Sequence, residues 1–324
     1  TREGGRGVEL LRATIAYNLG IVVDRYARIN FTGFKQLIDR IGGIRITTDC
    51  VIEDWRLITP ELDEQVEENW AMFTLPIGRH LMDGDLTLWY VRSRRNAVET
   101  DRGRRQQDVL RAIWRRMRER GLLGDLPALY QNLNQIVETD VTLDEMLGLL
   151  PMALNMDLSQ VSFYRFRQGV EIESGYTPDA NRRFVWVPQR EAVQRLVADF
   201  VQPPTRSRLG AEPPTIGIIN TTGIADLAYI AADRLELEGF RTTILNEPPG
   251  VPREYNKIID YTGADKGSLL PLLQRVLRIS DEGVQIEPDP QRTVDFRLYI
   301  GWRYQFTACT WPIRQPTPTP VPDS

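Results

Sequence analysis

The sequence predicts a mixed α/β protein of two domains, because segments with helical and strand periodicity alternate along the chain in two successive regions. The regions are separated at 202–213 by a stretch that combines proline, glycine and charged residues, which is typical of an interdomain linker. We therefore expect a sheet covered by helices over 1–201 and a small α/β domain over 214–311. The proline- and threonine-rich end, 312–324, cannot bury a core and is expected to be disordered.

Each element is predicted from the spacing of apolar residues and from the glycine and proline residues near its ends. In the first region we expect, in order, a helix at 5–19, a strand at 21–30, a helix at 32–39 closed by Gly42-Gly43, a strand at 44–48, a polar loop at 50–75, a mainly helical stretch at 83–156, a strand at 161–166 and a helix at 189–200. In the second region we expect strands at 215–220, 241–245, 257–261, 284–287 and 294–300, with helices at 224–237 and 268–277.

The composition argues against several classes of protein and site. The formal net charge of −4 does not suit a protein that coats nucleic acid, so any anion must be bound by a local patch. His80 is the only histidine, which argues against His-based triads, and we expect it to be structural or on the surface. No apolar run is long enough to cross a bilayer, although the chain starts at Thr1 and a targeting segment can lie upstream. Cys50 and Cys309 match no metal-ligand spacing; we expect two separate buried thiols, with a disulfide as the alternative in an exported protein.

An arginine-rich segment, 92–120, contains the residues that we expect to bind an anion. On a helix that begins near Asp101, a count of about 100° per residue places an apolar stripe on one side. The stripe consists of Val109, Leu110, Ile113 and Met117. The same count assigns four arginines to solvent, namely Arg104, Arg111, Arg115 and Arg118.

Arg102 and Gln106 lie on the apolar side in this count, where a charged group needs a partner. The free N–H groups at the N-terminus of the helix would add to an anion site there. Arg92 and Arg94 would bring two more guanidinium groups from the end of the preceding helix if the intervening loop folds back. Because guanidinium binds phosphate oxygens bidentately, several such groups together fit a pyrophosphate better than a carboxylate.

Three sequence motifs occur in a fixed order in the first region. They are Asp24-Arg25-Tyr26 leading into FTGFKQLIDRIGGI at 31–44, LMDGDLTLWYVRSR at 81–94, and RGRRQQDVL at 102–110. Together they resemble the LytR-CpsA-Psr family over about 5–200. In the second region, IINTTGIA at 218–225 and LELEGF at 235–240 similarly resemble the LytR C-terminal domain.

The resemblance implies an α/β phosphotransferase that moves a glycan from a polyprenyl-pyrophosphate carrier to peptidoglycan or another wall acceptor. By position in the motifs, Arg92, Arg94 and Arg102 correspond to the family's pyrophosphate-binding arginines and Gln106 to its conserved amide. Glu99 stands where the family has an aspartate, and it is the candidate catalytic carboxylate.

The resemblance further implies a Mg²⁺ cofactor and anchoring at the extracytoplasmic face of the bacterial membrane by an N-terminal helix. In the family, the metal ligands come from an Asn-x-Arg-x-Asp element, a second Asp and an Arg-Asp pair that precede the region matched here. None of these elements is present in this sequence. We therefore expect the N-terminal part of the enzyme domain to lie upstream, no metal ligand in this segment, and no transfer by this segment alone.

Three other interpretations stay open at this point. The arginines could form a salt-bridge network with acids such as Glu99 and Asp101. A non-catalytic envelope module would bind a glycan or a lipid-linked precursor without transferring it. A transcriptional attenuator would bind nucleic acid, but the acidic balance and the lack of a helix-turn-helix pattern lead us to expect no nucleic-acid partner.

Overall fold

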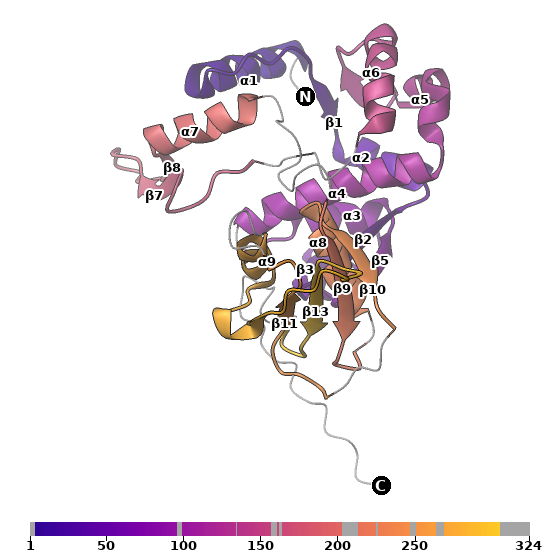
Figure 1. The fold of residues 1–324 in the computed structure, drawn as a ribbon. Helices are drawn as coiled ribbons and strands as arrows, with labels where there is room; N and C mark the ends of the chain where they lie inside the picture. Colours follow the sequence, from indigo (N-terminus) through magenta and orange to yellow (C-terminus); the bar gives the residue numbers. More distant parts are fainter. Residues whose placement is uncertain are drawn as a thin grey trace. The chain divides into compact units, whose positions relative to one another are not determined.

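The computed structural model describes residues 4–95, 99–133, 135–156, 161, 164–202, 213–224, 226–246, 251–263 and 269–304. Its combination of helices and strands confirms the predicted mixed α/β class (Figure 1). The chain separates into two compact units that do not follow chain order. The first consists of Thr1–Arg45, Leu81–Val91 and Gly103–Arg208, and the second of Ile46–His80, Arg92–Arg102 and Leu209–Ser324. Most of the expected linker and the whole expected tail lie outside the described residues, so the domain boundaries stay a prediction.

Helices and strands alternate through the first two thirds of the chain (Figure 1). In order they are α1 (Gly4–Leu19), β1 (Ala27–Ile29), α2 (Phe31–Arg40), β2 (Ile44–Thr48), β3 (Ile52–Leu57), η1 (Glu67–Asn69), β4 (Trp70–Leu75), β5 (Gly78–Met82), α3 (Gly84–Arg92), α4 (Glu99–Glu119), η2 (Leu122–Asp125), α5 (Leu126–Leu133), β6 (Val137–Thr139), α6 (Leu143–Asn155), β7 (Ile172–Tyr176), β8 (Phe184–Pro188) and α7 (Arg190–Val201). The helices predicted at 5–19, 32–39 and 189–200 and the strand at 44–48 are confirmed as α1, α2, α7 and β2. Among the described residues, the strands of this region pair only in twos: β1 with β6, β2 with β5, β3 with β4, and β7 with β8.

Several strand predictions for this region are wrong. The polar loop expected at 50–75 contains the antiparallel hairpin of β3 and β4, whose ends pair Ile52 with Leu75. Charged residues of β3 obscure the alternation because most of this hairpin is not deeply buried. The run at 21–30 forms only the short β1, and the hairpin of β7 and β8 was not predicted. Of the strand expected at 161–166, residues 161 and 164–166 are irregular and the other two lie outside the described residues.

The first unit has an apolar core to which α2, α3 and α4 contribute. Ile38, Tyr90 and Val109 are buried members of this core. Gly42 and Gly43 end α2 at positive φ angles of 76° and 74°, and Gly43 N–H donates to the Ile38 carbonyl at 2.9 Å. Because side chains with a Cβ are strained at such angles, the predicted closing role of this glycine pair is confirmed.

The C-terminal part of the second unit is a five-stranded sheet in the order β10-β9-β13-β11-β12 (Figure 1). Its elements are β9 (Thr215–Asn220), α8 (Leu227–Leu237), β10 (Arg241–Ile244), β11 (Lys257–Asp260), α9 (Leu270–Leu277), η4 (Asp281–Gly283), β12 (Val284–Ile286) and β13 (Phe296–Ile300). The parallel pairs β9–β10 and β11–β12 are each joined through a helix, as parallel neighbours require, whereas β13 runs antiparallel to β11. The five strands and two helices predicted for this region are therefore confirmed in order.

One apolar core joins this sheet to its helices. Ile218, Leu235, Phe296 and Leu298 are fully buried in it. Ile77, from the segment 46–80, packs against the same core. This contact is one reason why 46–80 and the C-terminal sheet fall into one unit.

Polar contacts also connect the segment 46–80 to α8 within this unit. The buried Asp49 carboxylate pairs with the Arg234 guanidinium. The Arg79 guanidinium lies 4.0 Å from the ring centroid of Tyr229. A buried carboxylate needs such a partner, so the Asp49 pair fixes where 46–80 meets α8.

Cys50 is disulfide-bonded, so the expectation of a separate buried thiol is wrong for this residue. Cys309 lies outside the described residues. Disulfides persist in oxidising compartments, which agrees with the expectation of an exported protein. His80 has the structural role that was predicted, because its Nε2 lies 2.9 Å from the Pro76 carbonyl oxygen and 3.0 Å from Thr48 Oγ1.

Candidate functional site

Helix α3 carries Arg92 at its C-terminal end, and contacts at its N-terminal end fix the helix in place. Gly84 N–H donates to Asp39 Oδ1 at 2.7 Å, and Asp83 caps the first turn. A Cβ at Gly84 would lie 2.4 Å from the Lys35 carbonyl oxygen, so only glycine fits there. The Asp-Gly pair of the second motif therefore packs α3 on α2, and the arginines follow at the other end of the helix.

A carboxylate from β3 fixes the segment that follows α3. Asp54 Oδ2 accepts the backbone N–H of Arg94 at 2.7 Å and that of Arg95 at 3.3 Å. Ser93 is buried, whereas the Arg92 and Arg94 side chains are exposed. The backbone is held while the Arg94 guanidinium stays accessible, which suits charge-assisted binding of an anion. Asp54 was not predicted as a site residue because its strand was expected to be a loop.

The first turns of α4 supply hydrogen-bond donors to the last carbonyls of α3. Arg105 is fully buried, donates to the Tyr90 carbonyl, and lies 5.4 Å from the Tyr90 ring centroid. Gln106 Nε2 lies 3.4 Å from the Val91 carbonyl oxygen. Carbonyls at a helix C-terminus lack intrahelical partners, so both contacts help to end α3. The burial of Arg105 identifies it as a structural residue within the arginine-rich segment.

The buried face of α4 differs from the one that the helical count predicted. Arg105, Val109 and Ala112 are buried, whereas Leu110 is 62% exposed and Gln106 is also exposed. Placing Gln106 and Leu110 on the core side was therefore wrong. A count of apolar residues fails here because a guanidinium with a carbonyl partner occupies a core position.

The four arginines assigned to solvent are not equally exposed. Arg118 is exposed and donates to the Met156 carbonyl at 3.1 Å, whereas Arg104, Arg111 and Arg115 are half-buried. The prediction of a fully solvated set is thus confirmed for Arg118 alone.

Arg116, on the same helix, has a packing role. Its guanidinium donates to the carbonyls of Ile41 at 3.1 Å and Gly42 at 2.8 Å, at the C-terminal end of α2. A cation is favourable at this end because the helix dipole is negative there. Several arginines of α4 therefore hold neighbouring helix ends.

The first motif, Asp24-Arg25-Tyr26, connects β1 to β6 and α6. Arg25 Nε donates to Glu145 Oε1 at 3.0 Å, and this hydrogen bond, with the capping box of α6, lowers the pKa of Glu145 from 4.5 to about 2. Tyr26 N–H donates to Asp140 Oδ1 at 2.8 Å and is the main cause of the lowered pKa of Asp140. These contacts make the motif part of the scaffold of the first unit.

The predicted pyrophosphate-binding residues divide between the two units. Arg92, Arg94 and Arg102 belong to the second unit and Gln106 to the first, although Arg102 and Gln106 are one turn apart in α4. The backbone of Glu99 begins α4, but its side chain lies outside the described residues. The convergence of these side chains on one anion stays a prediction.

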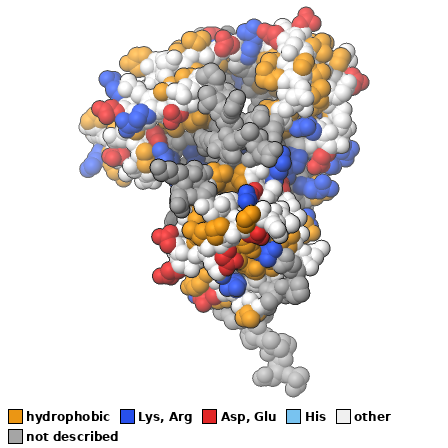
Figure 2. All heavy atoms as spheres, in the orientation of Figure 1, with side chains coloured by type: hydrophobic (Ala, Val, Ile, Leu, Met, Phe, Trp, Pro, Cys, Tyr) orange, Lys and Arg blue, Asp and Glu red, His pale blue; other side chains and the backbone are white. Residues whose placement is uncertain are grey.

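On the face drawn in Figure 2, acidic and basic side chains are interspersed. Within the described ranges, no group of three His, Cys, Asp or Glu side chains could hold a metal ion, so these residues do not fit a Mg²⁺ site and no chemical step is assigned to a metal. None of the helices in the described part of the chain is long and apolar enough to cross a membrane.

Comparison with known proteins matches the first part of the chain to a protein family. The profile of the LytR_cpsA_psr family matches residues 3–193. The "Polyisoprenyl-teichoic acid--peptidoglycan teichoic acid transferase TagT" of Bacillus subtilis is 28% identical over 155 residues, which cover 46% of this chain and 44% of that protein. The "Cell wall biosynthesis protein LcpA" of Corynebacterium glutamicum is 30% identical over 147 residues, which cover 45% of this chain and 26% of that protein. The crystal structure of B. subtilis TagV aligns with a TM-score of 0.46 and 20% identity, covering 58% of this chain and 66% of its own. The chain thus spans less than half the length of these two curated relatives.

Proposed function

The chain belongs to the LytR_cpsA_psr family, and from this premise we propose that it is part of a cell-envelope phosphotransferase. The proposed reaction transfers a phosphoglycan from a polyprenyl-pyrophosphate carrier to peptidoglycan or another wall acceptor. An acceptor hydroxyl attacks the phosphorus atom that bears the glycan, the bond from that atom to the bridging oxygen breaks, and polyprenyl phosphate leaves. The names of TagT, a teichoic acid transferase, and LcpA, a cell wall biosynthesis protein, support this proposal.

The fixed backbone at Arg94 is the structural observation that favours this chemistry. Phosphoryl transfer depends on holding the phosphates in place and stabilising charge on their oxygens, with little covalent work by the protein. In the proposal, Arg92, Arg94 and Arg102 bind the pyrophosphate oxygens and the amide of Gln106 donates a further hydrogen bond. Glu99 accepts the proton of the acceptor hydroxyl.

Two further parts of the proposal rest on family membership alone. The full-length protein is anchored at the extracytoplasmic face of the bacterial membrane, where polyprenyl carriers present their glycans. Mg²⁺ would supply positive charge to the pyrophosphate if it were bound, and none of the described residues is assigned as its ligand.

The test measures transfer of a labelled polyprenyl-pyrophosphate glycan to peptidoglycan by the full-length gene product. Arg94→Ala and Arg102→Ala should each lower the rate by about 10²–10³, which corresponds to about 2–4 kcal/mol of transition-state stabilisation. Arg118→Ala is the matched control, because this arginine is exposed on the same helix as Arg102. Its rate should stay within about twofold of the wild type.

Two outcomes would contradict the proposal in different ways. If the three variants lose activity equally, or none loses it, the arginine site is wrong. If the wild type binds the lipid-linked glycan but transfers it to no acceptor, the chain belongs to a non-catalytic glycan-binding module.

A further inference from the structure

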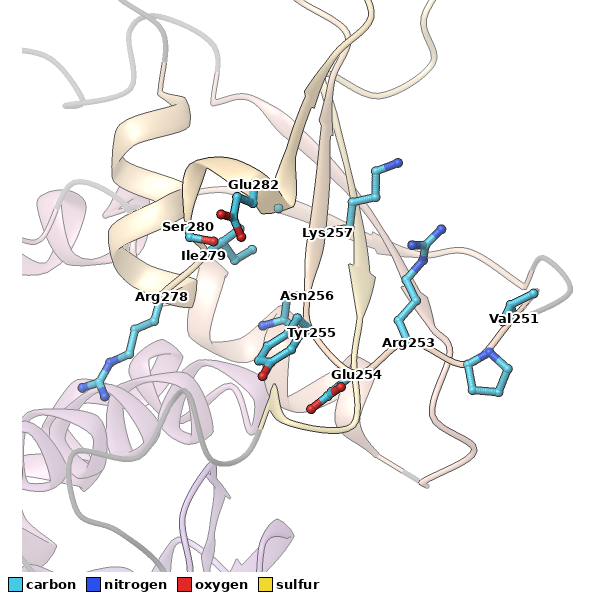
Figure 3. A pocket seen from close by; sticks show the side chains of 12 residues that line it. Val251, Arg253, Glu254, Tyr255, Asn256, Lys257, Arg278, Ile279, Ser280 and Glu282 are labelled. Carbon is cyan, nitrogen blue, oxygen red and sulfur yellow. The ribbon is translucent and has the colours of Figure 1, made fainter.

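A pocket of about 650 Å³ lies at one end of the C-terminal sheet, outside the arginine-rich segment (Figure 3). One wall is the segment 251–257, which leads into β11, and the other is the turn 278–283, between α9 and β12. Because β11 and β12 are parallel neighbours, both strands enter the sheet at this end. The volume falls in the range of sites that bind small molecules.

The lining of the pocket includes the side-chain amide of Asn256, whose orientation is fixed by a hydrogen bond. Asn256 is buried, and its Oδ1 accepts the N–H of Gly301 at 3.0 Å. A Cβ at Gly301 would lie 2.5 Å from the carbonyl carbon of Tyr255, so the end of β13 approaches this wall closely. With its oxygen engaged, Asn256 offers N–H donors rather than an acceptor to a ligand.

An exposed aromatic ring lines the same pocket. Tyr255 is 57% exposed, and the guanidinium of Arg303 lies 5.5 Å from its ring centroid. Arg303 in turn pairs with Glu254 at 2.8 Å. Cation–π contact and the ion pair therefore hold the ring in place while leaving a large part of it exposed to solvent.

The charges of the lining distinguish between possible ligands. Figure 3 shows three basic side chains extending away from Tyr255 and Asn256, namely those of Arg253, Lys257 and Arg278. The other wall contributes a hydroxyl and a carboxylate, from Ser280 and Glu282. The Glu282 carboxylate would repel a phosphate, and the three basic side chains, which could offset this repulsion, point away from the middle of the pocket. A neutral ligand rich in hydroxyl groups would not be repelled.

We infer that this pocket binds a neutral saccharide, with a pyranose ring stacked on Tyr255. One face of a pyranose consists of C–H groups and suits an aromatic ring, and its hydroxyl groups can bond the Asn256 amide and the Glu282 carboxylate. This site lies outside the residues of the proposed transfer site. It gives the C-terminal sheet a contact to carbohydrate that does not depend on the transfer reaction.

The test titrates this chain with two soluble probes, the β-1,4-linked tetramer of N-acetylglucosamine and maltotetraose, followed by calorimetry. At least one probe should bind saturably, and Tyr255→Ala should weaken that binding at least tenfold. Tyr255→Phe should stay within about twofold because the ring is kept. The matched control is Tyr229→Ala, since Tyr229 is also exposed beneath an arginine but does not line the pocket.

Glu282→Gln, a surface change, is a second variant that does not disturb the core, and it should weaken binding several-fold. The inference is overturned if neither probe binds saturably, if Tyr229→Ala weakens binding as much as Tyr255→Ala, or if inorganic phosphate binds in the pocket and the saccharides do not. The titration measures binding without transfer, so the two tests are independent. A failed transfer assay does not contradict saccharide binding, and a failed titration does not contradict the transfer proposal.

Discussion

The C-terminal sheet and the α3–α4 region bury side chains in different ways. The sheet has an apolar core in which Ile218, Phe296 and Leu298 are fully buried. Both regions also bury polar groups, such as Asp260 in the sheet and Thr87 in α3, but among the described residues only the α3–α4 region has a fully buried guanidinium, that of Arg105. Apolar burial stabilises a fold without specific partners, whereas each buried polar group needs a hydrogen bond of its own.

The polar groups buried around α3 bond the backbone of this helix near both of its ends. Thr87 Oγ1 donates to the Asp83 carbonyl at 2.6 Å, and Arg105 donates to that of Tyr90. Such contacts fix the ends of α3, from which the proposed phosphate-binding arginines extend. We therefore expect mutations in the sheet to affect stability most, and mutations around α3 to affect stability and binding together.

The largest expected effect is on the apolar core of the sheet. Leu298→Ala, in the central strand β13, should lower the free energy of unfolding by about 3–4 kcal/mol, because it removes buried apolar atoms and leaves a cavity. Ile286→Ala, on the edge strand β12, is the control and should change it by less than about 0.5 kcal/mol, since this side chain is exposed. Urea denaturation measures both. Equal losses in the two variants would show that the core assignment is wrong.

A smaller loss of stability is expected at the buried arginine of α4. Arg105→Ala should cost about 2–3 kcal/mol, because it empties a buried volume and leaves the Tyr90 carbonyl without this donor. Arg118→Ala, on the exposed side of the helix, should change stability by less than about 0.5 kcal/mol. The same denaturation measurement applies. If Arg118→Ala is the more costly change, the reported face of α4 is wrong.

The next effect is at Asp54, whose replacement is expected to change pyrophosphate binding more than stability. Asp54→Ala removes the acceptor for Arg94 N–H and Arg95 N–H, so it should weaken pyrophosphate binding about tenfold by releasing this segment. Asp54→Asn keeps an oxygen acceptor and should restore most of the affinity. Glu68→Ala, at an exposed acid of η1, is the control and should bind as the wild type does. If Asp54→Asn binds pyrophosphate as weakly as Asp54→Ala does, the charge of Asp54 matters for binding and its positioning of the Arg94–Arg95 backbone does not.

The smallest expected effect is on the stability of the first unit at acid pH. Because Arg25 and the capping box of α6 together lower the pKa of Glu145 from 4.5 to about 2, this carboxylate contributes stability that is fully present above pH 4.5 and is lost as the pH falls toward 2. The wild type should therefore lose more stability across that window than Glu145→Gln. Urea denaturation at several pH values measures the difference. Arg25→Ala should flatten the profile in part, because the capping hydrogen bonds of Thr142 remain, and a profile unchanged in both variants would contradict the ion pair.

The sequence by itself determined the mixed α/β class, the family and nearly every element of the C-terminal sheet. It succeeded there because residues such as Ile218 and Leu298 lie in strands whose burial produces a plain apolar pattern. It also identified Gly42-Gly43 as the end of α2, since positions with a positive φ are commonly occupied by glycine.

Only the tertiary structure decided which face of α4 is buried and which residue holds the arginine segment. Arg105 is polar and buried because a carbonyl lies beside it, and no periodic count can reveal that partner. The Asp54 carboxylate accepts the backbone N–H of Arg94 from a strand 40 residues away in the sequence. Long-range polar contacts of this kind depend on where the chain brings two residues together, which apolar spacing along one segment does not encode.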